Sequence, residues 1–190
     1  MAVRIDIEAT ERELFCCSKW WGDPDMPADM EYPMMQTPEG SYPLTFLCQV
    51  DCEEAAKSDA SGLMPKEGML YFFAAVDDLI GYDSPVHLGK GEWPKGSVMV
   101  KYAKEVNFET FNSCMMVDDE GESLSERAML LSMSPCEEDF GGIRLYGNAT
   151  REGYYNLLQV AFDPEHTLCI EIKESDLKYG NWKKSVAVLK

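Results

Sequence analysis

Short strands dominate the pattern of apolar and polar positions along the chain. Val3, Ile5 and Ile7 alternate with charged residues, which is typical of a strand with one buried face. Alternating or continuous apolar runs between Pro, Gly and Asp predict further strands at 44–50, 69–76, 98–102, 157–162, 167–173 and 185–189. We therefore expect an α+β fold that is rich in β-structure, with antiparallel sheets and few short helices.

Helix signals are few. Ser123 and Glu126 have the spacing of a capping box ahead of an apolar run that Pro135 stops, which predicts a helix over 123–133. Short helical turns are expected at 53–57 and from Ser175. The segment 24–43 holds five prolines and 83–96 is rich in Gly and Pro, so both are predicted to be surface loops. The acidic run 118–122 is predicted to be a solvated turn.

One order of features occurs twice. Gly22, a strand with Gln49, another strand and an Asp-Leu pair are followed later by Gly147, a strand with Gln159, another strand and a second Asp-Leu pair. The spacings differ, so any duplication has diverged by loop insertion. The pattern predicts two pseudo-symmetric β-units that share one core. Residues 1–190 are then one domain, with internal halves at 1–120 and 121–190.

Charge limits the partners. The 34 acidic and 17 basic residues give a net charge of −17, and residues 1–64 alone hold 13 acids against 4 bases. Nucleic acid and bare anionic membranes are excluded as partners, because binding them requires clustered Lys and Arg. No apolar run is long enough to span a membrane. The start of the chain lacks the pattern of a signal peptide, so we expect a cytoplasmic protein with seven reduced cysteines.

Motifs for catalysis or metal binding are weak. The chain has no Cys-x-x-Cys pair, and its two histidines, His87 and His166, have no ligand spacing to cysteine pairs. The glycines around Lys90 precede Pro94, which blocks the helix that a phosphate loop needs. We expect no metal and no cofactor, and the absence of a catalytic constellation favours a role other than catalysis.

Two features remain as binding candidates. The first is the run Trp20, Trp21, Gly22, Asp23 and Pro24, where an indole either closes the core or serves as an exposed aromatic anchor for a partner. The second comprises Gln49 and Gln159, which interrupt otherwise apolar strands. Their amides either pin an adjacent turn from inside the core or face a ligand cleft.

The chain resembles a known family in a series of motifs that occur in one order. They are Ser18-Lys19-Trp20-Trp21-Gly22-Asp23-Pro24, Tyr32-Pro33, Pro43-Leu44-Thr45-Phe46-Leu47-Cys48-Gln49-Val50, Leu63-Met64-Pro65 and Gly68-Met69-Leu70-Tyr71-Phe72-Phe73. This series is similar to the bacterial YwqG-like family, a domain family of unknown function. Trp21 stands where that family usually has Gly, and Ala149 where Pro is common. The resemblance implies a single cytosolic β-rich unit with related halves, and no catalytic residues.

The leading hypothesis from the sequence is a protein-binding module. The acidity points to a basic partner, bound through the face built from residues 1–127, and a sharper version is an antidote or regulator of a basic protein such as a toxin. The alternative is an enzyme or small-ligand-binding protein with a cleft between the two halves.

Overall fold

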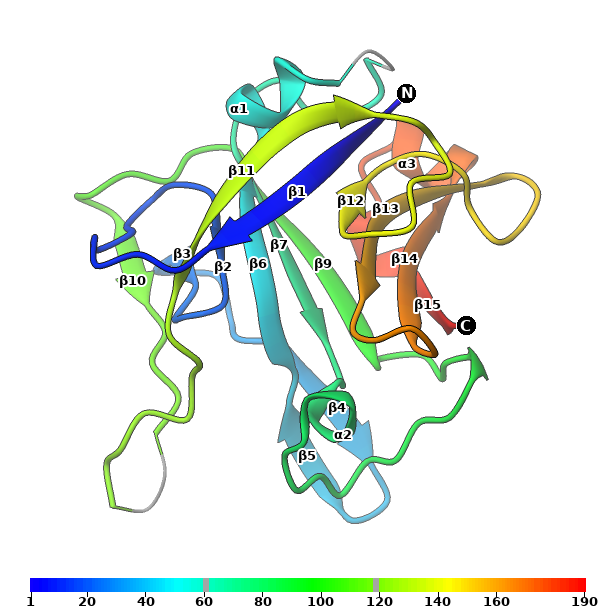
Figure 1. The fold of residues 1–190 in the computed structure, drawn as a ribbon. Coiled ribbons are helices and arrows are strands. Elements are labelled where there is room, and N and C mark those ends of the chain that lie inside the picture. Colours follow the sequence, from blue (N-terminus) through cyan, green and yellow to red (C-terminus); the bar gives the residue numbers. More distant parts are fainter. Residues whose placement is uncertain (60–61, 118–119) are drawn as a thin grey trace.

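Strands are the main regular structure in the computed structural model, which describes residues 1–59, 62–117 and 120–190 (Figure 1). The strands are β1 (Ala2–Glu8), β2 (Lys19–Trp20), β3 (Asp25–Pro27), β4 (Met34–Thr37), β5 (Gly40–Pro43), β6 (Thr45–Asp51), β7 (Met69–Ala74), β8 (Gly91–Glu92), β9 (Val98–Ala103), β10 (Phe111–Ser113), β11 (Met129–Cys136), β12 (Arg144–Leu145), β13 (Tyr154–Ala161), β14 (Thr167–Lys173) and β15 (Val186–Leu189). The helices are α1 (Cys52–Ala56), α2 (Asp77–Ile80), α3 (Glu174–Lys178) and the 3-10 turn η1 (Trp182–Lys184).

A large curled antiparallel sheet forms the body of the protein (Figure 1). Its strand order is β8-β15-β14-β13-β12-β1-β11-β2-β6-β7-β9, and the pairs β3 with β10 and β4 with β5 form two small ribbons beside it. The seven strands expected from the sequence are present, with ends that differ by three residues at most. The predicted β-rich fold with antiparallel sheets and few short helices is confirmed.

The strand order is symmetric about the central pair β1 and β11. From this pair, β12, β13, β14 and β15 follow in one direction and β2, β6, β7 and β9 in the other. The registers match as well: Lys19 pairs with Gln49 across β2 and β6, as Arg144 pairs with Gln159 across β12 and β13. The repeated order of features in the sequence therefore corresponds to two similar units of one sheet.

Irregularities in the two units coincide too. The pairing of β6 with β7 shifts between Phe46 and Cys48, and that of β13 with β14 shifts between Asn156 and Leu158. Each shift lies at the same number of residues from the glutamine of its strand, Gln49 in β6 or Gln159 in β13. Phe46 and Asn156 therefore occupy equivalent positions at the same bulge.

The halves 1–120 and 121–190 exchange a strand in this arrangement. β1, at the start of the chain, pairs with β12, whereas β11 pairs with β2. The two exchanged strands pair with each other along their whole length, from Ala2 opposite Cys136 to Glu8 opposite Leu130. One apolar cluster of buried residues joins both units, with members that include Val3, Leu47 and Leu157.

The helix predicted over 123–133 is wrong, because Met129–Cys136 is strand β11. Met129 and Met133 share a face in a strand as they do in a helix, since both periods bring residues four apart to one side. Pairing of Leu131 and Met133 with Ile7 and Ile5 of β1 decides between the two structures. Pro135 is tolerated because β2 pairs only with Met129 and Leu130 and leaves this edge of β11 free.

The two predicted loops also contain strands. The segment 24–43 holds β3 and the hairpin of β4 and β5, which turns at Pro38 and Glu39. Pro27 and Pro43 lie in these short two-stranded ribbons, and Pro24, Pro33 and Pro38 lie outside the strands. The segment 83–96 contains β8, which pairs with β15. The short helices predicted at 53–57 and from Ser175 are confirmed as α1 and α3. Of the predicted turn at 118–122, residues 118 and 119 lie outside the described residues.

A left-handed dipeptide follows β2 and is repeated after β12. Trp21 and Gly22 have φ values of 54° and 75°, and Tyr146 and Gly147 have φ values of 62° and 86°. A Cβ on Gly22 would lie 2.7 Å from the Cβ of Ala128, and one on Gly147 would lie 2.7 Å from the carbonyl oxygen of Glu138. Each turn therefore requires glycine both for its backbone angle and for the close approach of a neighbouring segment.

Replacing either of these glycines should destabilise the protein. We expect Gly22→Ala and Gly147→Ala each to lower the free energy of unfolding by on the order of 1–3 kcal/mol, because a side chain is strained in this region and has no space. Gly89→Ala is the control, since Gly89 lacks a positive φ and nothing would lie within 4 Å of its Cβ. Urea denaturation measures the differences, and equal stability of all three variants would contradict this explanation.

Candidate functional site

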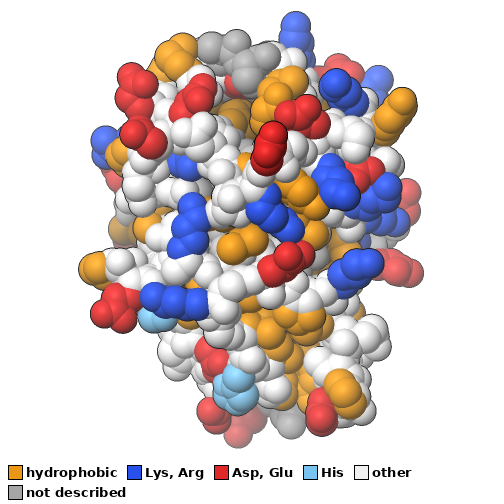
Figure 2. Space-filling model, turned by 90° about the vertical axis from the view of Figure 1, so that its right-hand side faces the viewer, with side chains coloured by type: hydrophobic (Ala, Val, Ile, Leu, Met, Phe, Trp, Pro, Cys, Tyr) orange, Lys and Arg blue, Asp and Glu red, His pale blue; other side chains and the backbone are white. Residues whose placement is uncertain are grey.

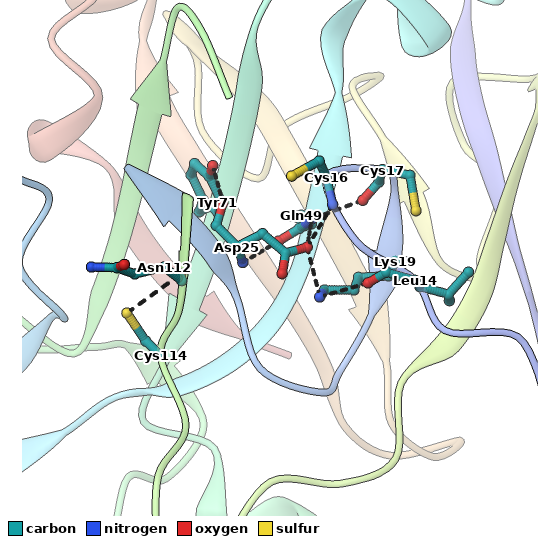
Figure 3. Close-up of polar contacts among 9 residues, drawn as sticks. All are labelled: Leu14, Cys16, Cys17, Lys19, Asp25, Gln49, Tyr71, Asn112 and Cys114. Carbon is teal, nitrogen blue, oxygen red and sulfur yellow. Dashed lines mark hydrogen bonds and ion pairs between the residues drawn. The ribbon is translucent and has the colours of Figure 1, made fainter. Parts of the chain in front are cut away.

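The candidate Gln49 lies in a buried polar cluster rather than in a cleft (Figure 3). Its Oε1 accepts a hydrogen bond from the backbone N–H of Asp25 at 2.9 Å, and its Nε2 donates to the carbonyl oxygen of Cys17 at 2.8 Å. Nε2 also contacts the Asp25 carboxylate at 2.8 Å. The amide thus joins the residues on both sides of the left-handed turn at Trp21 and fixes its shape.

We call these hydrogen bonds of Gln49 a clamp on the turn, and an ion pair supports it. Lys19 Nζ lies 2.8 Å from Asp25 Oδ2 and donates to the carbonyl oxygen of Leu14, and both charged side chains are at most 3 % exposed. Tyr71 donates its hydroxyl proton to the carbonyl oxygen of Asp25 at 2.7 Å (Figure 3). Replacing one member of this buried ion pair would leave the other charge without a partner, which strongly destabilises the folded protein.

Gln159 occupies the equivalent place in the second unit and holds the chain ahead of the second turn. Its Nε2 donates to the carbonyl oxygens of Phe140 and Gly142 at 3.1 and 3.0 Å, and its Oε1 accepts from Arg144 at 3.1 Å. Arg144 also donates to the carbonyl oxygens of Tyr146 and Asn148 around the second turn. Burial lowers the pKa of this guanidinium, whose position in the sheet matches that of Lys19.

The two tryptophans at the turn, Trp20 and Trp21, lie in different environments. Trp20 is 3 % exposed and belongs to the main core, whereas Trp21 lies at the surface of that core and lines a cleft. The backbone N–H of Trp21 donates to Leu47 and that of Gly22 donates to Glu126, which brings the segment around residue 126 against the turn. The side chain of Asp23 accepts a hydrogen bond from Ser125 at 2.6 Å and holds the same segment.

We call this hollow the Trp21 cleft. It has a volume of about 360 Å³ and lies between the turn, β5–β6, the segment 77–83 around α2, Met116 and the segment 124–126. Its lining residues are Trp21, Gly22, Tyr32, Pro43, Leu44, Thr45, Phe46, Asp77, Ile80, Tyr82, Asp83, Met116, Leu124, Ser125 and Glu126. Most of this wall is apolar, and Tyr82 and Leu124 are 47 % and 58 % exposed.

The charges of the Trp21 cleft have one sign. Asp77, Asp83 and Glu126 are its charged residues, and the described lining residues include no Lys, Arg or His. Thr45 donates its hydroxyl proton to Asp77, and Tyr82 donates to Glu126, which raises the pKa of the tyrosine. The indole Nε1 of Trp21 is buried without a hydrogen-bond partner. This arrangement suits the binding of apolar and cationic groups better than proton transfer by a base such as histidine.

Of the candidates predicted from the sequence, Trp21 and Gly22 line the Trp21 cleft, Asp23 supports its wall, and Trp20 packs in the core. The buried carbonyl of Pro24 accepts from the backbone N–H of Cys114. Gln49 and Gln159 are separated from the cleft. Sequence reasoning missed its other side, formed by the segment 77–83, Met116 and the segment 124–126, because only the strand order brings them beside Trp21.

A groove between the two units also exists. It lies between β9 and η1, has a volume of about 720 Å³, and is lined by Lys101, Lys183 and Lys184 as well as by Asp29 and Glu31. The alternative hypothesis expects a cleft between the halves, and this groove has that location. A ligand or reaction there stays a prediction.

The cysteines near the buried cluster are not activated. Burial raises the pKa of Cys16, Cys17 and Cys114 above that of a free thiol, which disfavours the nucleophilic thiolate. All seven cysteines are free thiols. Among the described residues, no group of three or more His, Cys, Asp and Glu side chains could hold a metal ion.

Comparison with known proteins identifies a family without assigning an activity. A family model described as "Domain of unknown function (DUF1963)" matches residues 18–153, which include both left-handed turns and the Trp21 cleft. No curated protein matches the chain. No helix in the described part of the chain is long and apolar enough to cross a membrane.

The hydrogen bonds of the two glutamines predict a loss of stability on mutation. Gln49→Leu and Gln159→Leu should each lower the free energy of unfolding by on the order of 1–3 kcal/mol, because backbone groups at the turns lose their partners. Gln36→Leu is a control, since this exposed amide contacts only Ser41. Thermal denaturation tests the difference, and unchanged melting temperatures for both buried variants would reject the clamping role.

Thiol titration should separate the cysteines into two groups. Seven should react in denaturant, but no more than four in the native protein, because Cys48, Cys52 and Cys169 are buried. Burial raises the pKa of Cys52 to about 12, so its native thiolate population is negligible. Fewer than seven thiols in fresh denatured protein would instead reveal a disulfide.

Proposed function

The chain belongs to this domain family of unknown function, and we propose that it is a protein-binding module whose Trp21 cleft takes an exposed segment of a basic partner. One observation carries the proposal: the cleft combines an apolar wall with charged residues that are all carboxylates. An apolar side chain of the partner would fill the cleft, and a neighbouring Lys or Arg would meet Asp77, Asp83 or Glu126.

The size and shelter of the Trp21 cleft support a short segment as the occupant. A volume of about 360 Å³ lies at the lower end of ligand sites and accommodates one or two side chains. Ion pairs gain strength where a cleft excludes water, so a cation against these carboxylates contributes more there than on an open surface. The exposed side chains of Tyr82 and Leu124 extend the apolar contact beyond the mouth.

The charge distribution also favours the Trp21 cleft as the binding surface for a basic partner. Figure 2 shows the side of the molecule formed by the C-terminal strands, where Lys and Arg side chains lie among Asp and Glu. Residues 128–190 hold 9 acids and 7 bases, whereas residues 1–127 hold 25 acids and 10 bases. The excess negative field therefore originates from the part of the chain that forms most of the cleft, and it would speed encounters with a basic partner.

A finer version of the proposal is an antidote or regulator that masks a basic protein such as a toxin or nuclease. The acidity and the cleft support it to the extent that they favour any basic partner. The likeness to the YwqG-like family and the cytoplasmic location belong to the same proposal, since a cytoplasmic antidote needs neither export nor a membrane.

A pair of peptides with opposite charges tests the proposal. The probes are Gly-Arg-Leu-Arg-Gly-amide with fluorescein on its N-terminal amino group and the same labelled peptide with Glu in place of Arg, titrated by fluorescence anisotropy at low and high salt. We expect binding of the basic peptide only, with an affinity that falls as salt rises. Binding of both peptides with equal affinity, or of neither, would overturn the proposal.

Two charge reversals locate the binding site. Asp83→Lys in the cleft should weaken binding of the basic peptide by roughly tenfold, since a rim carboxylate becomes a repelling cation. Glu152→Lys changes the net charge equally but lies outside the Trp21 cleft, and it should have a much smaller effect. Equal losses in both variants would show that net charge alone attracts the peptide.

A further inference from the structure

A second cavity lies beside the second left-handed turn. It has a volume of about 190 Å³, and its wall includes Tyr146, Gly147, Tyr154, Tyr155 and Asn156. We call it the Tyr146 cavity. Tyr146 follows β12 as Trp21 follows β2, and the backbone N–H of Tyr146 donates to Leu157, the counterpart of Leu47.

The Tyr146 cavity is the counterpart of the Trp21 cleft. Phe46 lines the first and Asn156 lines the second, and these residues occupy equivalent positions at the bulges of β6 and β13. Thr45 precedes Phe46 and lines the Trp21 cleft, and Tyr155 precedes Asn156 and lines the Tyr146 cavity. Both units therefore keep a hollow at one place, with different side chains around it.

Asn156 is the most informative of these differences. It is completely buried, and its Nδ2 donates to the carbonyl oxygen of Tyr146 at 3.0 Å. Its Oδ1 is buried without a hydrogen-bond partner. Buried polar atoms in folded proteins nearly always have a partner, so an amide where the other unit has phenylalanine leaves an acceptor without a donor.

The rest of the wall indicates the chemistry of the missing donor. Tyr146, Tyr154 and Tyr155 offer aromatic surface, which favours contact with flat molecules. Glu138 is the charged side chain among the described lining residues, and it already lies 2.6 Å from the amino group of Met1. The cavity thus lacks an unpaired charge that would call for an ionic ligand.

We propose that the Tyr146 cavity is a second ligand site, which takes a small, uncharged, planar molecule with an N–H donor for Asn156 Oδ1. Aromatic carboxamides and amino-substituted heteroaromatic rings are the class that fits. Binding involves no covalent step, and the site is independent of the Trp21 cleft and of any basic partner.

Benzamide and methyl benzoate form a matched pair of probes, because they share a flat ring and a carbonyl group but only benzamide has an N–H donor. Chemical shifts of the ¹⁵N-labelled protein are followed during titration with each compound. We expect saturable shifts with benzamide around 146–157 and at least tenfold weaker binding of methyl benzoate. Equal binding of the two, or no binding of benzamide, would overturn the proposal.

Variants connect binding to the cavity. Asn156→Leu should weaken benzamide binding at least tenfold, and Tyr155→Leu, at a partly exposed position, is a second test should the first variant fold poorly. Asp83→Lys in the Trp21 cleft should leave benzamide binding unchanged. Shifts centred on the Trp21 cleft, or full binding by both cavity variants, would contradict the assignment.

Discussion

The structure depends on a buried amide that closes a left-handed turn, once in each unit. Gln49 holds the chain before and after its turn, Gln159 holds the chain before its turn, and a buried cation, Lys19 or Arg144, lies opposite each of them. A chain that passes through such a turn exposes several backbone groups that the core cannot leave unpaired. The glutamine and the cation supply such partners, and the turns place Trp21 beside the Trp21 cleft and Tyr146 beside the Tyr146 cavity.

The two units share a backbone and differ in what they place around it. At equivalent bulges, Phe46 faces an apolar cluster with Phe73, whereas Asn156 lies opposite Glu171. Glu171 is completely buried and accepts hydrogen bonds from the backbone of Thr150 and from the Arg151 side chain. The two hollows therefore differ in their lining, while the clamps and glycines give both the same position. One fold therefore presents two hollows whose linings differ in chemistry.

The sequence predicts the local features well. Strands such as 69–74 and 167–173 follow from apolar runs that need no knowledge of their partners. The echo of Gln49 in Gln159 identifies the two clamps, since a polar residue in a buried strand must have a specific partner. Met129 and Met133 mislead, because residues four apart share a face in helices and strands alike. The segment 77–83, Met116 and the segment 124–126 carry no such signal, as their role at the Trp21 cleft arises from a strand order that local patterns do not encode.

The exchange of β1 and β11 between the units has a consequence for biosynthesis. Ile5 is made well before its partner Met133, which lies far along the chain in β11. Until then, the apolar face and free edge of the first strand lack a partner, and such edges invite association with other chains. Pairing over so long a stretch of chain is also slow, because distant contacts must overcome the entropy of the intervening loop. The first strand therefore completes its pairing only after β11 has been made.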